Sequence, residues 1–499
     1  MNTQQYMEQL ETLDIRMSSL TYTSALMGWD SMTLASKKGV DARSSVIGNM
    51  SELFFTSLIN DEVKEMLDYL TEHKSELDET IAAKVRLYLK DYNEIMKIPK
   101  DEYAAYQALI SKSNLAWEEA REKNDFSIFA PYLDQVLKAK KKFVKYRGYE
   151  GHPYNTLLDD YEDGLTVEAA DEFFSNLKAK IVPLVKRIQA KEAPKNAFLD
   201  LTYDISKQKE YSKYMMEVLN FRMDCGCLAE SAHPFTMNLS REDVRITTKF
   251  YEKDLLSSIS STIHETGHAL YEQNISPDFG VSILTSGTSM GIHESQSRLY
   301  ENNFGRSLPF WHKHYGRLQD LYPEQLGNIS VEDFQKSLNT VKPSLIRIDA
   351  DEVTYPLHVM VRYEMEKMIM SDDVNVDELP RLWNDKYEEY LGVRPETDSD
   401  GILQDVHWSE GLFGYFPSYA LGSAYASQFE FYMRKDIDVD ALLASGDMAP
   451  ILKWLSEKIH VYGSSKIPSE IIEGATGEKF NPKYFVDYLE TKYSAIYDL

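Results

Sequence analysis

The chain has 499 residues, with 43% hydrophobic and 27% charged side chains, a composition typical of a globular protein and not of a disordered one. Its length allows one large domain or two to three ordinary ones. The formal net charge is −26, from 54 Lys and Arg against 80 Asp and Glu, and a field of this sign repels nucleic-acid phosphates and anionic lipid surfaces. We therefore expect neither nucleic acid nor a membrane among its partners.

The cellular location is predicted from three further features. Residues 1–20 contain neither a basic n-region nor an apolar h-region, which argues against a signal peptide. No apolar run reaches the roughly 18 residues that a transmembrane helix needs. The two cysteines, Cys225 and Cys227, are too close for an ordinary structural disulfide, so we expect free thiols in a reducing compartment. Together these features predict a cytoplasmic protein.

Helical periodicity dominates the chain. Apolar residues recur at intervals of three and four in these segments, taken in chain order: 78–96, 101–125, 132–147, 166–193, 379–392 and 482–497. Thr166, followed by Glu168, predicts the start of a helix. Pro183 is expected to kink or divide that helix.

Strand signals are sparse. Residues 238–254 show the clearest alternation of apolar and polar side chains and predict a short hairpin or ribbon. No internal repeat and no low-complexity linker divides the chain. We therefore predict an all-α fold with at most a small β ribbon. We expect one domain over residues 1–499, with a helical part to about 225 and the functional motifs between about 226 and 430.

One helical segment carries a metal-binding pattern, His-Glu-Thr-Gly-His at residues 264–268. Residues four apart lie on one face of a helix, so His264 and His268 would present two imidazoles to a single point. Glu265 would lie about 100° further round the helix, beside the ion, where it can act as the general base for a metal-bound water. The alternative is a pair of histidines packed in an aromatic core, because chance matches to this pattern occur.

The third ligand is expected in the segment that follows. Catalytic zinc takes three protein ligands and keeps one open position. Glu294 lies in a second predicted helix, reached through a loop, and an antiparallel return would bring it back to the two histidines. His293 is the competing ligand. We prefer Glu294, because two histidines and a glutamate form a ligand set of catalytic zinc, and a single negative ligand leaves the ion electrophilic.

Further motifs follow one another in an order that resembles the M32 family of zinc carboxypeptidases, the thermostable carboxypeptidase Taq type. They are GWD (28–30), HPYNTLLDDYEDG (152–164), HPF (233–235), DVRIT (243–247), HETGH (264–268), HESQS (293–297), IRIDAD (346–351) and GILQDVHW (401–408). The resemblance runs almost end to end. It implies a nearly all-helical fold with a long substrate groove, metal-dependent carboxypeptidase activity and a homodimer. By position it implies zinc ligands His264, His268 and Glu294, with Glu265 as the catalytic base.

An enzyme that removes C-terminal residues must hold a free carboxylate, and arginine does this through two parallel charge-assisted hydrogen bonds. The motifs contain two candidates, Arg245 and Arg347. The alternative for either is a buried ion pair, such as Arg347 with Asp349 or Asp351.

Peptide hydrolysis also develops negative charge on the carbonyl oxygen, which needs a preorganised donor. Residues 404–428 are rich in such groups. A loose similarity to helical metallopeptidases of the thimet oligopeptidase type favours Tyr419 as the main donor and His407 as its helper, with Tyr415 and Tyr425 as weaker candidates. In a chain with 33 Tyr, the alternative for each tyrosine is a packing role.

The predicted function is zinc-dependent hydrolysis of C-terminal peptide bonds, in which Glu265 activates the water. Cobalt or manganese could occupy the same ligands. Two alternatives remain: an endo-oligopeptidase with the same zinc apparatus, and a non-catalytic helical binding protein with a structural metal. Peptides with and without a free C-terminal carboxylate would distinguish the predicted exopeptidase from the endo-oligopeptidase, because only an exopeptidase needs that group.

Overall fold

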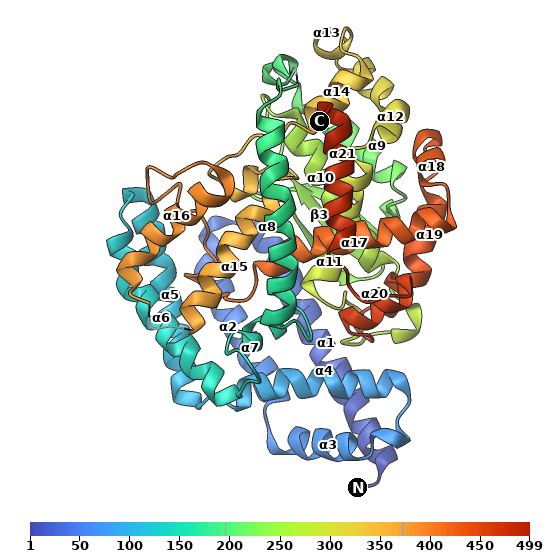
Figure 1. Cartoon of the computed structure of the whole chain (residues 1–499). Helices are drawn as coiled ribbons and strands as arrows, with labels where there is room; N and C mark the ends of the chain where they lie inside the picture. Colours follow the sequence, from blue (N-terminus) through green and yellow to red (C-terminus); the bar gives the residue numbers. More distant parts are fainter. Residues whose placement is uncertain (195, 372–373) are drawn as a thin grey trace. The chain divides into compact units, whose positions relative to one another are not determined.

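The computed structural model describes residues 1–194, 196–371 and 374–499. Helices make up most of this described part, and a small three-stranded sheet is present near the middle of the chain (Figure 1). The prediction of an all-α fold with a small β element is confirmed. No helix within the described ranges combines the length and the apolar content needed to cross a membrane.

Residue contacts divide the chain into two compact units. Unit 1 comprises residues 1–93, 195–338 and 429–479, and unit 2 comprises residues 94–194, 339–428 and 480–499. Each unit is therefore assembled from segments that are far apart in the sequence, which no composition shift indicates. The prediction of one domain over the whole chain stays a prediction.

Unit 1 contains the sheet and these helices: α1 (Thr3–Thr33), α2 (Val40–Leu58), α3 (Asp61–Glu72), most of α4 (Glu79–Met96), α9 (Ile205–Val218), α10 (Leu255–Gln273), α11 (Met290–Arg298), α12 (Leu308–Leu321), α13 (Pro323–Leu326), α14 (Val331–Leu338), α18 (Val439–Ser445), α19 (Ala449–Lys458) and α20 (Pro468–Thr476). A first core cluster joins α1, α3 and α4. A second lies between the sheet and α10, and it is the one that positions the site.

Unit 2 contains α5 (Lys100–Lys123), α6 (Phe126–Arg147), α7 (Asn155–Asp159), α8 (Val167–Gln189), α15 (Tyr355–Ser371), α16 (Leu379–Leu391) and α21 (Lys483–Tyr497). Helices α5 and α6 pack as a pair, and α8 lies along α21 (Figure 1). Helix α17 (Pro417–Asp436) belongs to unit 2 up to Gln428 and to unit 1 from Phe429.

The sheet consists of β1 (Gly226–Glu230), β2 (Phe235–Ser240) and β3 (Asp243–Thr248) in the order β1-β3-β2. Strands β2 and β3 form an antiparallel hairpin, while β1 runs parallel to β3. The predicted ribbon at 238–254 is therefore present but begins and ends earlier. Strand β1 lacks period-two alternation. Its first residue, Gly226, has no room for a side chain, because a Cβ there would lie 1.9 Å from the carbonyl oxygen of Val244.

Helix α8 begins as predicted, because the side chain of Thr166 accepts a hydrogen bond from the backbone N–H of Ala169. The predicted division at Pro183 is wrong, since α8 is continuous from Val167 to Gln189. A proline inside a helix costs about 3 kcal/mol, but α8 buries a long apolar face on both sides of this residue. Packing of that face outweighs the lost backbone hydrogen bond.

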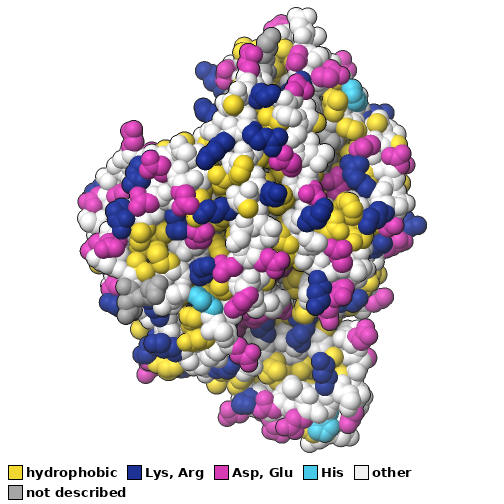
Figure 2. Space-filling view, in the orientation of Figure 1, with side chains coloured by type: hydrophobic (Ala, Val, Ile, Leu, Met, Phe, Trp, Pro, Cys, Tyr) yellow, Lys and Arg dark blue, Asp and Glu magenta, His cyan; other side chains and the backbone are white. Residues whose placement is uncertain are grey.

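Charged side chains of both signs are present on the face of the molecule in Figure 2. Figure 2 shows acidic and basic side chains interspersed on the face in view, with hydrophobic groups between them. Interspersed charges of this kind do not produce a strong field of one sign over this face.

Candidate metal centre

Helix α10 carries the first two predicted ligands. The helix begins after Asp254, whose side chain accepts a hydrogen bond from the backbone N–H of Ser257. It packs against β2 and β3 on one side and against α9 and α11. His264 and His268 follow each other by one turn, and their ring centroids are 4.8 Å apart. The predicted common face of the two imidazoles is therefore present.

The third predicted ligand comes from α11. The Oε2 atom of Glu294 lies 3.5 Å from Nε2 of His264 and 3.4 Å from Nε2 of His268. The three donor atoms lie within 4.8 Å of one another, and they form a group that could hold a metal ion. Glu294 is 7% exposed, so this carboxylate converges on the two imidazoles in a largely buried place.

The distances from Glu294 to the two histidines suit a small divalent ion. Two donors that each lie about 2.0–2.1 Å from a tetrahedral ion are roughly 3.3–3.4 Å apart. The two distances from Glu294 to the histidines are close to this value. Two imidazole nitrogens with one carboxylate oxygen are also the donors that zinc takes in catalytic sites. The residues present therefore fit a divalent metal ion.

Close approach of two helix backbones brings Glu294 into place. A Cβ on Gly267 would lie 2.7 Å from Cα of Ser297 and 2.8 Å from the carbonyl oxygen of Gln296. Only glycine therefore lets α10 and α11 approach this closely. This explains the glycine in the His-Glu-Thr-Gly-His pattern, which the metal chemistry alone does not require.

Gly267→Ala is expected to lower the free energy of unfolding by about 1–3 kcal/mol, because the added methyl overpacks the contact between the two helices. Displacement of α11 should also weaken metal binding. Urea unfolding and a metal-binding titration measure the two effects. Gly474→Ala in α20 is the matched control, since a Cβ there meets nothing within 4 Å and should stabilise the helix by up to about 1 kcal/mol.

Acidic and basic side chains surround His264 and Glu294. Nδ1 of His264 lies 2.8 Å from Oε2 of Glu301. Arg298 donates to Oε1 of Glu294 at 2.7 Å and to Glu301 at 3.1 Å. Glu294 therefore turns one oxygen to the imidazoles and the other to a guanidinium. Burial alone would raise the pKa of Glu294, but Arg298 and His264 hold it well below its ordinary value.

The two histidines differ in their electrostatic surroundings. Burial lowers the pKa of His268 to about 3, which keeps its imidazole neutral at pH 7 and leaves a lone pair for a metal. Burial acts in the same direction on His264, but the carboxylates of Glu294 and Glu301 raise its pKa above the ordinary value. The protein thus places more negative charge beside His264 than beside His268.

Both ring nitrogens of His293, the competing ligand, have other partners. Its Nδ1 lies 2.6 Å from Nδ1 of His268, and its Nε2 lies 2.6 Å from Oε1 of Glu272. His293 therefore contacts the opposite edge of the His268 ring from the edge that faces Glu294. In this geometry Glu294, and not His293, shares the point between the two α10 histidines.

Glu265 lies beside this group and is 6% exposed. Its Oε2 accepts a hydrogen bond of 2.6 Å from the hydroxyl of Thr236 on β2. Burial raises the pKa of the Glu265 carboxyl, while His264 and the Thr236 hydroxyl oppose the rise. A buried carboxylate of raised pKa, held by a fixed donor, is suited to accept and return a proton.

Arg245, on β3, also belongs to unit 1. Its Nε and Nη2 donate to the two carboxylate oxygens of Asp243 at 2.8 and 2.6 Å. Its guanidinium lies 5.6 Å from the ring centroid of Trp29, in the GWD motif. Asp243 and Arg245 are two residues apart on β3, so their side chains lie on the same face of the strand and can pair.

The remaining predicted site residues lie in unit 2, where Arg347 pairs with the carboxylate of Asp405. Arg347 donates to Oδ1 of Asp405 through Nε at 3.0 Å and Nη2 at 2.9 Å. Arg362 donates to Oδ2 through Nε at 2.6 Å. The partner of Arg347 is thus neither Asp349 nor Asp351. Asp351 instead accepts from the backbone N–H groups of Val353 and Thr354, just before α15.

The oxyanion candidates lie beside Arg347. Its guanidinium carbon lies 4.9 Å from the ring centroid of Tyr419. The rings of Tyr415 and Tyr419 are 5.1 Å apart, and His407 lies 5.2 Å from Tyr415 and 6.3 Å from Tyr419. Burial lowers the pKa of His407 to about 4, so this imidazole is neutral at pH 7. Tyr425 is instead 4% exposed and packs on Phe480, which suits a core residue.

Several contacts were missed by reasoning from the sequence, although some had a signal. Arg298 and Glu301 follow Glu294 by four and seven residues, a spacing that places them on one helical face. Asp405 lies inside a quoted motif, but nothing in that motif names its partner. Thr236 had no signal, because its role depends on how β2 packs against α10.

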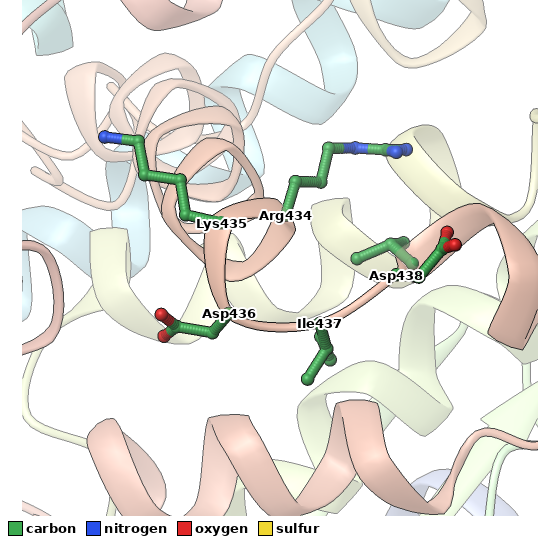
Figure 3. A pocket seen from close by; sticks show the side chains of 6 residues that line it. Arg434, Lys435, Asp436, Ile437 and Asp438 are labelled. Atoms are coloured by element: carbon green, nitrogen blue, oxygen red, sulfur yellow. The ribbon is translucent and has the colours of Figure 1, made fainter.

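A surface pocket of about 350 Å³ lies at the C-terminal end of α17 and is shown in Figure 3. It is lined by Arg434, Lys435, Asp436, Ile437, Asp438 and Val439. Two of its charged residues already have ion-pair partners, since Arg434 pairs with Glu430 and Asp440, and Asp436 pairs with Lys458. None of the predicted site residues lines it.

Within a mostly helical fold, α10 and α11 thus bring together a group of side chains that could hold a metal ion. Comparison with family models matches residues 9–493 to the carboxypeptidase Taq (M32) metallopeptidases, and the chain belongs to this family. Carboxypeptidase 1 of Bacillus subtilis (strain 168) is 47% identical over 484 residues, with 97% of each chain covered. Thermostable carboxypeptidase 1 of Pyrococcus furiosus is 36% identical, with 96% of each covered.

The fold agrees with solved structures of the family. The crystal structure of an M32 carboxypeptidase from Deinococcus radiodurans R1 superposes with a TM-score of 0.96 at 32% identity, covering 99% of this chain and 100% of that one. The predicted family and enzyme class are thereby confirmed. The protein is a metal-dependent carboxypeptidase, a hydrolase that acts on peptides, and its family favours this over the alternative of a non-catalytic binding protein.

Proposed function

We propose that the metal is zinc, that His264, His268 and Glu294 bind it, and that Glu265 is the general base of peptide hydrolysis. The observation that carries this proposal is the convergence of the three donor atoms within 4.8 Å. A zinc ion in such a site supplies a Lewis acid for the scissile carbonyl and lowers the pKa of water towards about 7. Cobalt or manganese suits the same donors, and metal analysis with an anomalous-scattering map identifies the ion.

Glu265 moves the proton. Its carboxylate accepts a proton from the attacking water and delivers it to the nitrogen of the leaving amine. Burial makes this carboxylate more basic than an exposed one, and the hydroxyl of Thr236 fixes the oxygen Oε2. The second oxygen then faces the reacting water in a constant orientation.

Thr236→Val is expected to lower kcat by about 10–100-fold, because a hydrogen bond to a charged group contributes about 1.5–3 kcal/mol. Its effect on KM should be small, since Thr236 orients the base and does not hold substrate. Steady-state kinetics on one peptide separates the two constants. Thr266→Val is the matched control, because the hydroxyl of that buried threonine donates only to a helix carbonyl, that of Thr262. Equal loss in both variants would contradict the orienting role.

Arg347 is the better candidate for holding the terminal carboxylate of the substrate. Arg245 and Asp243 form a one-to-one pair whose charges cancel. Arg347 and Arg362 share the single carboxylate of Asp405, and within the described residues no other carboxylate is within ion-pair distance of either arginine. With His407 neutral, these groups keep an excess positive charge that a substrate carboxylate would neutralise.

Tyr419 and His407 are the proposed donors to the oxyanion. Burial and the neighbouring Tyr415 raise the pKa of Tyr419 well above its ordinary value, so its hydroxyl keeps its proton. Nδ1 of His407 is buried and has no hydrogen-bond partner among the described residues. A neutral imidazole beside a protonated phenol provides two donors, and one such donor contributes about 3 kcal/mol to the transition state.

The homodimer and the cytoplasmic location remain predictions.

The alternative is an endo-oligopeptidase with the same metal apparatus. It needs no group for the terminal carboxylate. Digestion of a peptide and of its C-terminally amidated twin distinguishes the two, because an exopeptidase should cleave only the first at an appreciable rate. Equal rates would favour the endopeptidase.

A further inference from the structure

Each candidate ligand histidine on α10 is held at Nδ1 by a different kind of group. His264 contacts the carboxylate of Glu301 at 2.8 Å. His268 contacts the imidazole of His293 at 2.6 Å, and that imidazole contacts the carboxylate of Glu272 at 2.6 Å. A carboxylate therefore acts on His264 directly, whereas on His268 it acts through a second histidine.

When Nε2 of His268 keeps a lone pair for the metal, the contacts allow only one arrangement of protons on His268 and His293. Nδ1 of His268 must then carry the proton and donate to Nδ1 of His293. Nε2 of His293 must carry the second proton and donate to Oε1 of Glu272. The carboxylate of Glu272 also accepts hydrogen bonds from the backbone N–H of Gly287 and from the side-chain N–H of Asn238.

The ring of His293 is closely packed between its partners. Glu272 follows His268 by one turn of α10, so His293 bridges two successive turns of the same helix face. Its ring centroid lies 4.7 Å from that of His268 and 5.2 Å from that of Tyr271. A Cβ on Gly287 would lie 2.6 Å from Cδ2 of His293, so the loop closes directly on the ring.

We propose that His293 is a positioning residue, which connects Glu272 to His268 and holds the His268 ring with Nε2 towards Glu294. This inference rests on the proposed metal site. Partners beyond the ligands fix the tautomer and orientation of a metal-binding histidine, and their loss typically costs 10–100-fold in metal affinity. His293 thus acts on the metal through His268 without being a ligand.

Two substitutions separate the two hydrogen bonds of His293. In His293→Asn, the side-chain oxygen occupies about the place of Nδ1, so the acceptor for His268 remains while the contact with Glu272 is lost. In His293→Gln, the amide nitrogen occupies about the place of Nε2, so the contact with Glu272 remains while His268 loses its acceptor. Apparent zinc affinity, measured by competition with a chromogenic chelator at fixed pH, reports on the metal without any substrate.

We expect His293→Gln to weaken zinc binding by about 10–100-fold, and His293→Asn to weaken it less. Glu272→Gln should weaken zinc binding in the natural background and add little to His293→Gln, because Glu272 acts through His293. Equal affinities for the natural protein and both His293 variants would overturn the proposal. So would fully additive losses for Glu272→Gln and His293→Gln.

Two controls separate this inference from the proposed metal site. His268→Ala should abolish tight zinc binding; if it does not, the ligand assignment itself is wrong. His460→Gln changes another buried histidine of unit 1, one that bonds to Gln296 and contacts no proposed ligand, and should leave zinc affinity unchanged. Urea midpoints of the zinc-free variants show whether a loss of affinity reflects a loss of folding.

Discussion

Glu265→Gln is expected to lower kcat by about 10²–10⁴-fold while zinc stays bound at the natural stoichiometry. The amide has nearly the shape of the carboxylate, and its oxygen can still accept the hydrogen bond from Thr236. It cannot accept a proton from water at neutral pH. Turnover with a short peptide and metal content by elemental analysis measure the two quantities on one preparation.

Glu265→Asp is the informative companion to this variant. It keeps the base but withdraws it by one methylene group, so it should be more active than the glutamine variant. A glutamine variant with activity within tenfold of the natural protein would remove Glu265 as the base. A glutamine variant without zinc would show that Glu265 takes part in holding the metal.

Arg347→Met is expected to lower kcat/KM by about 10²–10³-fold on peptides with a free C-terminus, because removing one partner of a buried charge pair costs about 2–5 kcal/mol. The fold should survive, since Asp405 keeps its bonds to Arg362. Activity on the amidated twin should change little, so the ratio of the two rates should fall. Kinetics on both peptides gives this ratio directly.

Arg245→Met is the matched control for this prediction. In the natural protein Arg245 neutralises one aspartate, so this pair has no excess positive charge to offer a substrate carboxylate. A large loss of kcat/KM with Arg245→Met, together with a small loss with Arg347→Met, would show that Arg245 and not Arg347 holds the terminal carboxylate. An equal loss of kcat/KM on both peptides with Arg347→Met would show that Arg347 does not bind the terminal carboxylate.

Helices were predictable in place and extent because their pattern is local. The segment 78–96 corresponds to α4, 101–125 to α5 and 482–497 to α21, each within a few residues. Strand β1 was not predicted, because five residues without alternation are held in place by a neighbour about twenty residues later. Continuity of α8 through Pro183 was likewise a result of packing.

The candidate metal group was largely predictable for the same reason. The spacing of His264 and His268 by one helical turn determines a shared face before any tertiary contact forms. Glu294 required only that the next helix return alongside, and Gly267 shows in the structure why the two helices can meet there. The resemblance to a known family supplied the order of motifs that made this reading specific.

The amino-acid sequence by itself determined the helical class, the two imidazoles on one face, the glutamate that follows the first of them and the family. Only the tertiary structure decided the partners of the charged groups: Asp405 for Arg347, Asp243 for Arg245, Glu301 for His264, and His293 with Glu272 for His268. The reason is physical. Helix periodicity arises from neighbours along the chain, whereas a buried charge takes its partner from whichever distant segment the core packs against it.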